Sequence, residues 1–179
     1  MHSKPELIQT LQSQGLELQT LLSSVDTAHF FDGSSENWSV AHHALHLANA
    51  ARRVALGLNT PAALSPREPL PSRDFDALKA AYLETLANTP SETLRTMGGR
   101  TTLEDFTEPE AYKVQVISSW NGAVHGLIAA LDAFPEENLE ATALPHPLLG
   151  PISTREMLFF TVYHNTHHQR GILNLLERP

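Results

Sequence analysis

The residues best suited to chemistry in this sequence are histidines, and they gather in two short stretches. One stretch runs from Trp38 to Leu47 and reads WSVAHHALHL, and the other runs from Tyr163 to Gly171 and reads YHNTHHQRG. Histidine binds divalent metals through a neutral ring nitrogen, and two histidines four residues apart on a helix can direct their nitrogens to one point. The chain has no cysteine, so any metal must be held by imidazole and oxygen.

The second stretch is predicted to lie on the buried face of the last helix. Ser153 with Glu156 three residues later forms a capping-box pattern, so this helix is expected to begin there and to run to about Glu177. At 100° per residue, His164 and His168 share one face with Met157, Phe160, Thr161, Gly171 and Leu175. Unpaired imidazoles in an apolar core are costly, and a divalent cation would remove that cost. Alternatively, backbone carbonyls or water satisfy these nitrogens.

Two ligands do not hold a metal firmly, and the first stretch offers His42, His43 and His46 as a third. Ser39 is predicted to cap the helix that carries them. Helical periodicity places His43 about 70° and His46 about 130° from the centre of the apolar stripe, so it slightly favours His43. His42, His43 and His167 could instead carry protons or support the ligands, or simply be surface or packing residues. The remaining histidines are expected to be solvated or to cap local structure: His2, His29, His125 and His146.

The hydrophobic pattern predicts an all-α bundle in a single domain spanning residues 1–179. Apolar residues recur at three- and four-residue steps in several segments, and no alternating strand pattern is found. The predicted helices span Pro5 to about Val25, Ser39 to about Leu58, Asp74 to Asn88, Ala111 to Phe134, and Ser153 to about Glu177. The proline-containing segments 59–71 and 135–152 are interpreted as loops, and residues 89–105 receive no firm assignment. Gly122 and Gly126 are expected to let a neighbouring helix approach closely.

Charge and composition limit the partners of the chain. The formal net charge is −8, with 20 acidic and 12 basic residues, and no run of Lys or Arg provides the footprint for binding phosphate backbones. We therefore expect a small-molecule substrate and neither nucleic acid nor membrane as a partner. No stretch reaches the roughly 18 apolar residues of a membrane span. The first residues lack the pattern of a secretory signal, so a cytoplasmic location is expected.

The two histidine stretches together resemble those of the DinB/YfiT-like superfamily of metalloenzymes. The shared features are a Trp-Ser pair at a helix start, a His-Leu pair eight residues after the Trp, and a terminal HxxxH followed by Gly. The segment HPLLGPISTREMLFFTVYH also looks like one branch of that superfamily. The resemblance implies a four-helix up-down-down-up bundle with additional helices or loops in the middle of the chain. It also implies that His46, His164 and His168 are the three metal ligands, which overrides the preference for His43, and that members bind Ni or Zn and often form homodimers.

A three-histidine site with an open position can lower the pKa of a bound water or thiol. Asn165 stands where the zinc proteases have a catalytic Glu, which argues against peptidase activity. Some relatives of this fold are thiol S-transferases, so the resemblance implies a metal-dependent transferase that uses a low-molecular-weight thiol on a small molecule. A metal-dependent hydrolase and a non-catalytic metal-binding bundle are the alternatives. Trp38 matches the family signature, although a buried Trp at a helix entry is usually a core residue.

Overall fold

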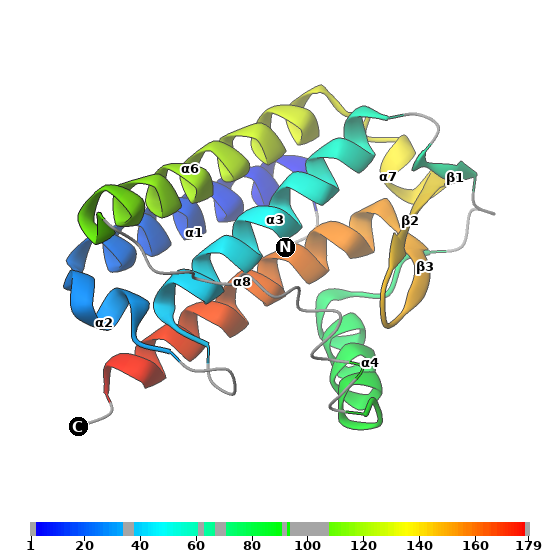
Figure 1. The fold of residues 1–179 in the computed structure, drawn as a ribbon. Coiled ribbons are helices and arrows are strands. Elements are labelled where there is room, and N and C mark those ends of the chain that lie inside the picture. Colours follow the sequence, from blue (N-terminus) through cyan, green and yellow to red (C-terminus); the bar gives the residue numbers. More distant parts are fainter. Residues whose placement is uncertain are drawn as a thin grey trace.

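Four long helices form the body of the computed structural model, which describes residues 3–33, 38–60, 63–66, 71–90, 93 and 108–177. These helices are α1 (Lys4–Ser24), α3 (Val40–Asn59), α6 (Pro109–Ala133) and α8 (Thr154–Leu176). Figure 1 shows that α1 and α8 run in one direction and that α3 and α6 run in the other. The up-down-down-up topology implied by the family resemblance is therefore confirmed.

The helix starts follow local capping chemistry. Ser39 caps α3 by accepting the backbone N–H of His42, and Ser153 caps α8 by accepting that of Glu156. Asp74 caps the predicted middle helix, α4 (Phe75–Ala87), in the same way. A short helix, α2 (Thr27–Phe31), was not predicted, because its five residues are too few to show a helical period.

The segment 135–152 is not the loop that its prolines indicated. It contains the short helix α7 (Asn138–Ala141) and a hairpin of β2 (Thr142–His146) and β3 (Gly150–Ser153), and β1 (Ser65–Pro66) pairs with β2. Pro145 lies directly opposite Pro151. Neither residue has an N–H, and the two form a non-hydrogen-bonded pair of the antiparallel ladder, where no N–H is required. The prolines therefore do not disrupt the hairpin. Gly150, with φ of 68°, supplies the backbone conformation that closes the turn.

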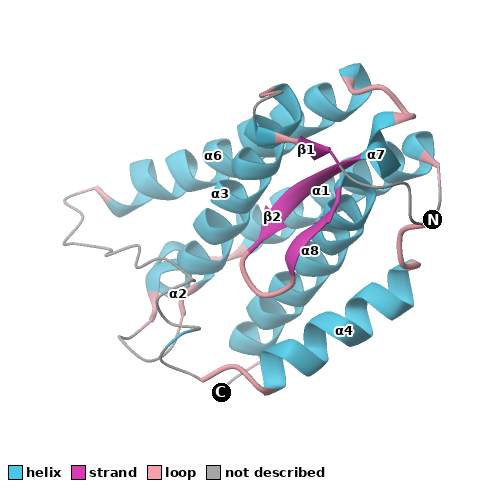
Figure 2. Cartoon of the chain, turned by 90° about the vertical axis from the view of Figure 1, so that its right-hand side faces the viewer, coloured by secondary structure: helices cyan, strands magenta, loops and turns pink. Residues whose placement is uncertain are grey.

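The small sheet lies at the end of the bundle where α3 and α6 end and α8 begins (Figure 1). Figure 2 shows the β2–β3 hairpin in front of the helices, with α4 along the lower edge of the molecule. Helix α4 packs against α8. Of the predicted middle region, residues 91–92 and 94–107 lie outside the described part of the chain. Among the described residues, no helix is long and apolar enough to cross a membrane.

The expectation that Gly122 and Gly126 allow close helix packing is wrong. A Cβ built on either glycine meets no atom within 4 Å. The close approach between α1 and α6 is at Gly15 of α1, where a Cβ would lie 3.0 Å from Val124 Cγ1. Trp120, which is fully buried, donates its Nε1–H to the carbonyl oxygen of Gly15 at 3.2 Å. The small residue that brings these helices together is therefore on α1.

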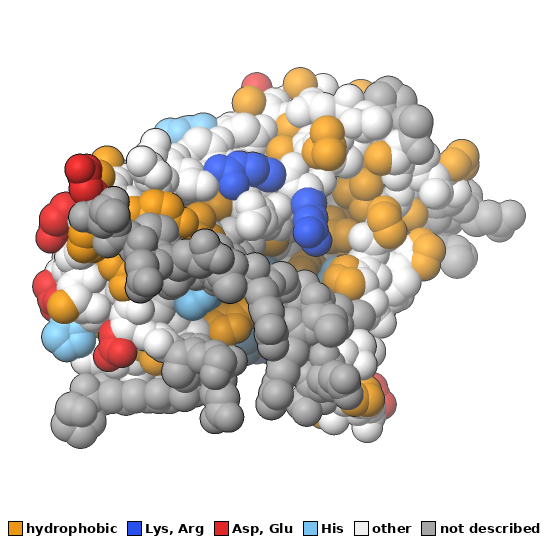
Figure 3. All heavy atoms as spheres, viewed as in Figure 1, with side chains coloured by type: hydrophobic (Ala, Val, Ile, Leu, Met, Phe, Trp, Pro, Cys, Tyr) orange, Lys and Arg blue, Asp and Glu red, His pale blue; other side chains and the backbone are white. Residues whose placement is uncertain are grey.

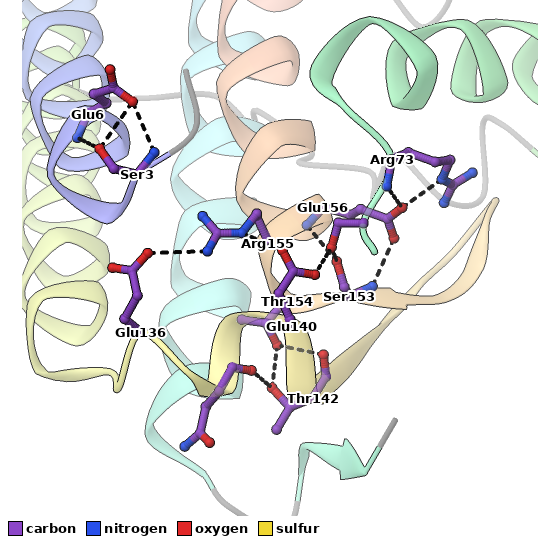
Figure 4. Close-up of polar contacts among 12 residues, drawn as sticks. Ser3, Glu6, Arg73, Glu136, Glu140, Thr142, Ser153, Thr154, Arg155 and Glu156 are labelled. Carbon is purple, nitrogen blue, oxygen red and sulfur yellow. Dashed lines mark hydrogen bonds and ion pairs between the residues drawn. The ribbon is translucent and has the colours of Figure 1, made fainter. Parts of the chain in front are cut away.

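A polar network fixes the start of α8 to the segment that leads into α4 (Figure 4). Arg73 donates its backbone N–H and its Nε–H to Glu156 Oε1, at 3.0 and 2.7 Å, and the backbone N–H of Ser153 donates to Glu156 Oε2 at 2.9 Å. Arg155 donates to Glu140 Oε1 at 2.6 Å. Burial alone would raise the pKa of Glu156, but these hydrogen bonds and the charge of Arg73 outweigh burial and hold that pKa below its usual value.

Replacing Glu156 with Gln is expected to lower the free energy of unfolding by about 1–3 kcal/mol at neutral pH, because a charge-assisted network loses its anion. The folded state depresses the pKa of Glu156, so its contribution is present above the unfolded pKa and is lost as the pH falls through the folded pKa. Urea unfolding at neutral and acidic pH should show that acidification lowers the free energy of unfolding less for Glu156→Gln than for the parent protein. The exposed Glu137→Gln is the control, and equal acid losses in the Glu156 variant and the parent would contradict this account.

Candidate metal centre

Helices α3 and α8 bring the two histidine stretches together. The helices run antiparallel and contact each other, so the first turns of α3 lie against the second half of α8 (Figure 1). His46 lies near the start of α3, and His164 and His168 lie one turn apart on α8. His164 and His168 are each only 8% exposed, which confirms that their face of α8 is buried.

The three histidines implied by the family resemblance form one cluster. His46 Nε2 lies 3.0 Å from His164 Nε2, and His168 Nε2 lies 3.0 Å from the same His164 nitrogen. One ligand atom from each of the three lies within 4.8 Å of the others. Among the residues that the structure describes, no other Cys, His, Asp or Glu joins a group of this kind. The periodicity argument that favoured His43 is therefore not supported.

The donor set and its spacing fit a divalent transition metal. Two nitrogens bound at about 2.0–2.1 Å to a tetrahedral zinc ion lie about 3.3–3.4 Å apart, close to the two observed separations. Burial, and to a lesser extent the neighbouring imidazoles, lower the pKa of His164 to about 3. Burial also lowers the pKa of His168. Both rings are therefore neutral at physiological pH, which is the form that offers a lone pair to a metal.

Aromatic rings hold the imidazoles in place. Trp38 stacks on His168, with the ring planes 12° from parallel and the centroids 5.4 Å apart. It also makes an edge-to-face contact with His46, with the centroids 4.9 Å apart. Phe160 stacks on His164, with the ring centroids 5.0 Å apart and the ring planes 24° from parallel. Trp38 was expected to be an ordinary core residue, but its ring forms one wall of the cluster. Its position one residue before a helix cap does not reveal this, because the stacking partner lies on a distant helix.

His43 lies beside the cluster rather than in it. Its Nδ1 is 2.8 Å from Nδ1 of His168, the nitrogen that faces away from His164. Burial, and to a lesser extent the neighbouring histidines, lower the pKa of His43 to about 4. His42 instead completes the N-cap of α3, where its Nδ1 accepts the backbone N–H of Ser39 at 3.2 Å. His167 is exposed.

Most of the remaining histidines match the expected roles. His29 is exposed and lies 2.5 Å from Asp26, and His125 is exposed on α6. His146 is only 4% exposed, so it is not solvated, but it does cap a turn, because its Nδ1 accepts the backbone N–H groups of Leu148 and Leu149. His2 lies outside the described residues.

A buried amide pair orients α8 relative to α1. Gln14 donates to the carbonyl oxygen of Val162 at 3.0 Å and to Thr166 Oγ1 at 3.0 Å, and it accepts a hydrogen bond from Asn165 at 3.1 Å. Asn165 therefore faces α1 and takes no part in the cluster. Sequence reasoning missed Gln14, although a polar residue within the buried stripe of leucines on α1 is the signal that could have found it.

Replacing His46, His164 or His168 with Ala is expected to abolish stoichiometric zinc or nickel while the protein stays helical, because each change removes a ligand and little apolar packing. Metal per chain would be measured by mass spectrometry after loading and dialysis, with helicity from circular dichroism. His125→Ala, an exposed imidazole on α6, is the matched control. Parent-like metal content in the three cluster variants would show that these residues are not ligands.

Solved structures with the same fold support this topology. The chain matches a four-helix bundle protein, TT2238, at TM-score 0.59 and 16% identity, over 96% of this chain and 99% of that one. It matches YfiT from Bacillus subtilis, described as a probable metal-dependent hydrolase with an unusual four-helix bundle topology, at TM-score 0.61 and 18% identity, over 96% and 85% of the two chains. It matches the colibactin self-resistance protein ClbS, solved in complex with double-stranded DNA, at TM-score 0.60 and 17% identity, over 100% of this chain and 98% of that one.

Comparison with curated proteins by sequence gives no significant match. The family model of the DinB superfamily matches residues 10–172, which include both histidine stretches and most of each of the four long helices. The agreement between this match and the bundle topology leaves one assignment: the chain belongs to the DinB superfamily.

Proposed function

We propose that this protein is a metal-dependent enzyme acting on a small molecule, with one divalent ion, Ni or Zn, held by His46, His164 and His168. The observation that carries the proposal is the convergence of three ring nitrogens within 4.8 Å of one another on two rigid helices. A structural zinc site normally uses four protein ligands, whereas catalytic sites use three and leave a position for substrate. Among the residues that the structure describes, three ligands meet, which favours a reactive centre over a purely structural one.

The preferred reaction is transfer involving a low-molecular-weight thiol. A divalent ion at this site would lower the pKa of a coordinated thiol or water. Hydrolysis also benefits from a carboxylate that moves a proton. Among the described residues, Glu156 and Glu140 are bound by Arg73 and Arg155, and no carboxylate joins the histidine cluster. Thiol chemistry needs no such base once the thiol is ionised, so the surroundings favour it.

Hydrolysis is the second candidate, and the similarity to YfiT favours it. That protein is described as a probable metal-dependent hydrolase, and it shares the bundle topology with this chain. A third possibility, binding without turnover, is suggested by ClbS, which is described as a self-resistance protein. The experiment below separates these three.

A small organic anion is the substrate type that best suits the surroundings of the cluster. Hydrophobic side chains gather over the sheet end of α3, next to basic side chains over the same helix (Figure 3). Arg53 is exposed and follows His46 by seven residues, so both side chains leave α3 on one face, about 10 Å apart along its axis. Val54 and Phe160 contribute to the apolar group beside them. The net charge of −8 disfavours nucleic acid and anionic membranes as partners.

The test uses protein loaded with cobalt, whose visible spectrum reports its ligands. Adding a small thiol such as cysteine should produce a sulfur-to-cobalt charge-transfer band in the parent protein and none in His164→Ala. The parent, loaded with zinc or nickel, should then consume thiol in the presence of an electrophilic aryl halide. Hydrolysis of an activated ester with no thiol band would favour the hydrolase. Metal binding with neither response would favour a non-catalytic bundle and overturn the proposed activity.

A further inference from the structure

The two ring nitrogens of His168 face two different partners. Nε2 lies 3.0 Å from His164 Nε2 inside the cluster, and Nδ1 lies 2.8 Å from His43 Nδ1 outside it. A neutral imidazole carries one proton, and which nitrogen holds it depends on the hydrogen bond made by the other. His43 is therefore placed where it can decide which nitrogen of His168 has a free lone pair.

The chemistry of the pair settles the direction of this hydrogen bond when a metal is present. If His168 Nε2 gives its lone pair to a metal, the proton must be on Nδ1, which then donates to His43 Nδ1. His43 must in turn be the acceptor, with its own proton on Nε2. Histidine ligands of metals commonly donate their second N–H to a neighbouring acceptor, which fixes the ring and makes it a better ligand.

The fold holds His43 in this position through a glycine on α8. A Cβ built on Gly171 would lie 2.7 Å from His43 Cε1, closer than real Cβ atoms approach, and 3.3 Å from His43 Nε2. The His43 ring therefore lies directly against the backbone of α8, one turn beyond His168. Trp38 contacts the ring from another side, with centroids 5.2 Å apart.

We infer that His43 is a positioning residue for His168, and that Gly171 provides the space His43 needs to reach it. This inference rests on the proposed metal centre. It assigns to His43 a role in metal affinity without making it a ligand, since its contact is with the outer nitrogen of His168. It also explains why a glycine interrupts the second half of a helix where Ala would be a better helix former.

Zinc affinity, measured by competition with a chromogenic chelator, tests the inference. His43→Ala should weaken zinc binding about 10–100-fold. His43→Asn, whose side-chain oxygen can take the place of Nδ1 as an acceptor, should recover most of the loss. Gly171→Ala should also weaken binding, although every histidine is retained and the helix itself gains a better helix former. Gly126→Ala, where a Cβ meets nothing within 4 Å, is the matched control and should bind zinc like the parent.

The double variant His43→Ala/Gly171→Ala distinguishes a shared pathway from two separate defects. If Gly171 acts through His43, the double variant should bind zinc no more weakly than His43→Ala alone. Nitrogen-15 NMR of the zinc-loaded parent should show the His168 proton on Nδ1. Parent-like affinity in His43→Ala, or full additivity in the double variant, would overturn the inference. Failure of the parent itself to bind zinc would overturn the proposed metal centre, and this role of His43 with it.

Discussion

The organisation of this protein depends on burying uncharged imidazoles between two antiparallel helices. An imidazole nitrogen without a partner in a protein interior is costly, and here Nε2 atoms from His46, His164 and His168 converge. Desolvation and mutual repulsion keep the buried pair on α8 neutral, with the pKa of His164 lowered to about 3. A metal would use the lone pairs that this arrangement presents, whereas protonation would place like charges about 3 Å apart.

Such a cluster requires that α8 be fixed both in its rotation about the helix axis and in its position along that axis. Its rotation is fixed by the amide pair of Gln14 and Asn165, which ties α8 to α1. Its position along the axis is fixed at the first turn of α8, where Glu156 completes the capping box and binds Arg73. Strand β3 and the segment that leads into α4 thus serve the centre indirectly, because they supply Ser153 and Arg73, which hold the start of α8.

Periodicity and capping were sufficient to predict the four long helices, α4, and the buried face that carries His164 and His168. They could not choose between His43 and His46, because the angle on one helix does not say where its partner lies. The family resemblance indicated His46, which the cluster contains. The β2–β3 hairpin was missed because its prolines resemble loop residues until their opposed pairing is known. The role of Trp38 depends on contacts with a distant helix, which a local pattern does not contain. Gln14 was missed although it is a polar residue within the buried leucine stripe of α1.

The most direct measurement is X-ray absorption spectroscopy of the protein loaded with one equivalent of zinc or nickel. The fine structure counts the imidazole rings around the metal, because their outer-ring atoms give a distinct multiple-scattering pattern. We predict three imidazoles around the metal, with exchangeable ligands of light atoms completing its coordination shell. In His46→Ala the number of imidazoles should fall to two. Two or fewer imidazoles in the parent protein, or a fourth protein ligand that closes the site, would contradict an open three-histidine centre.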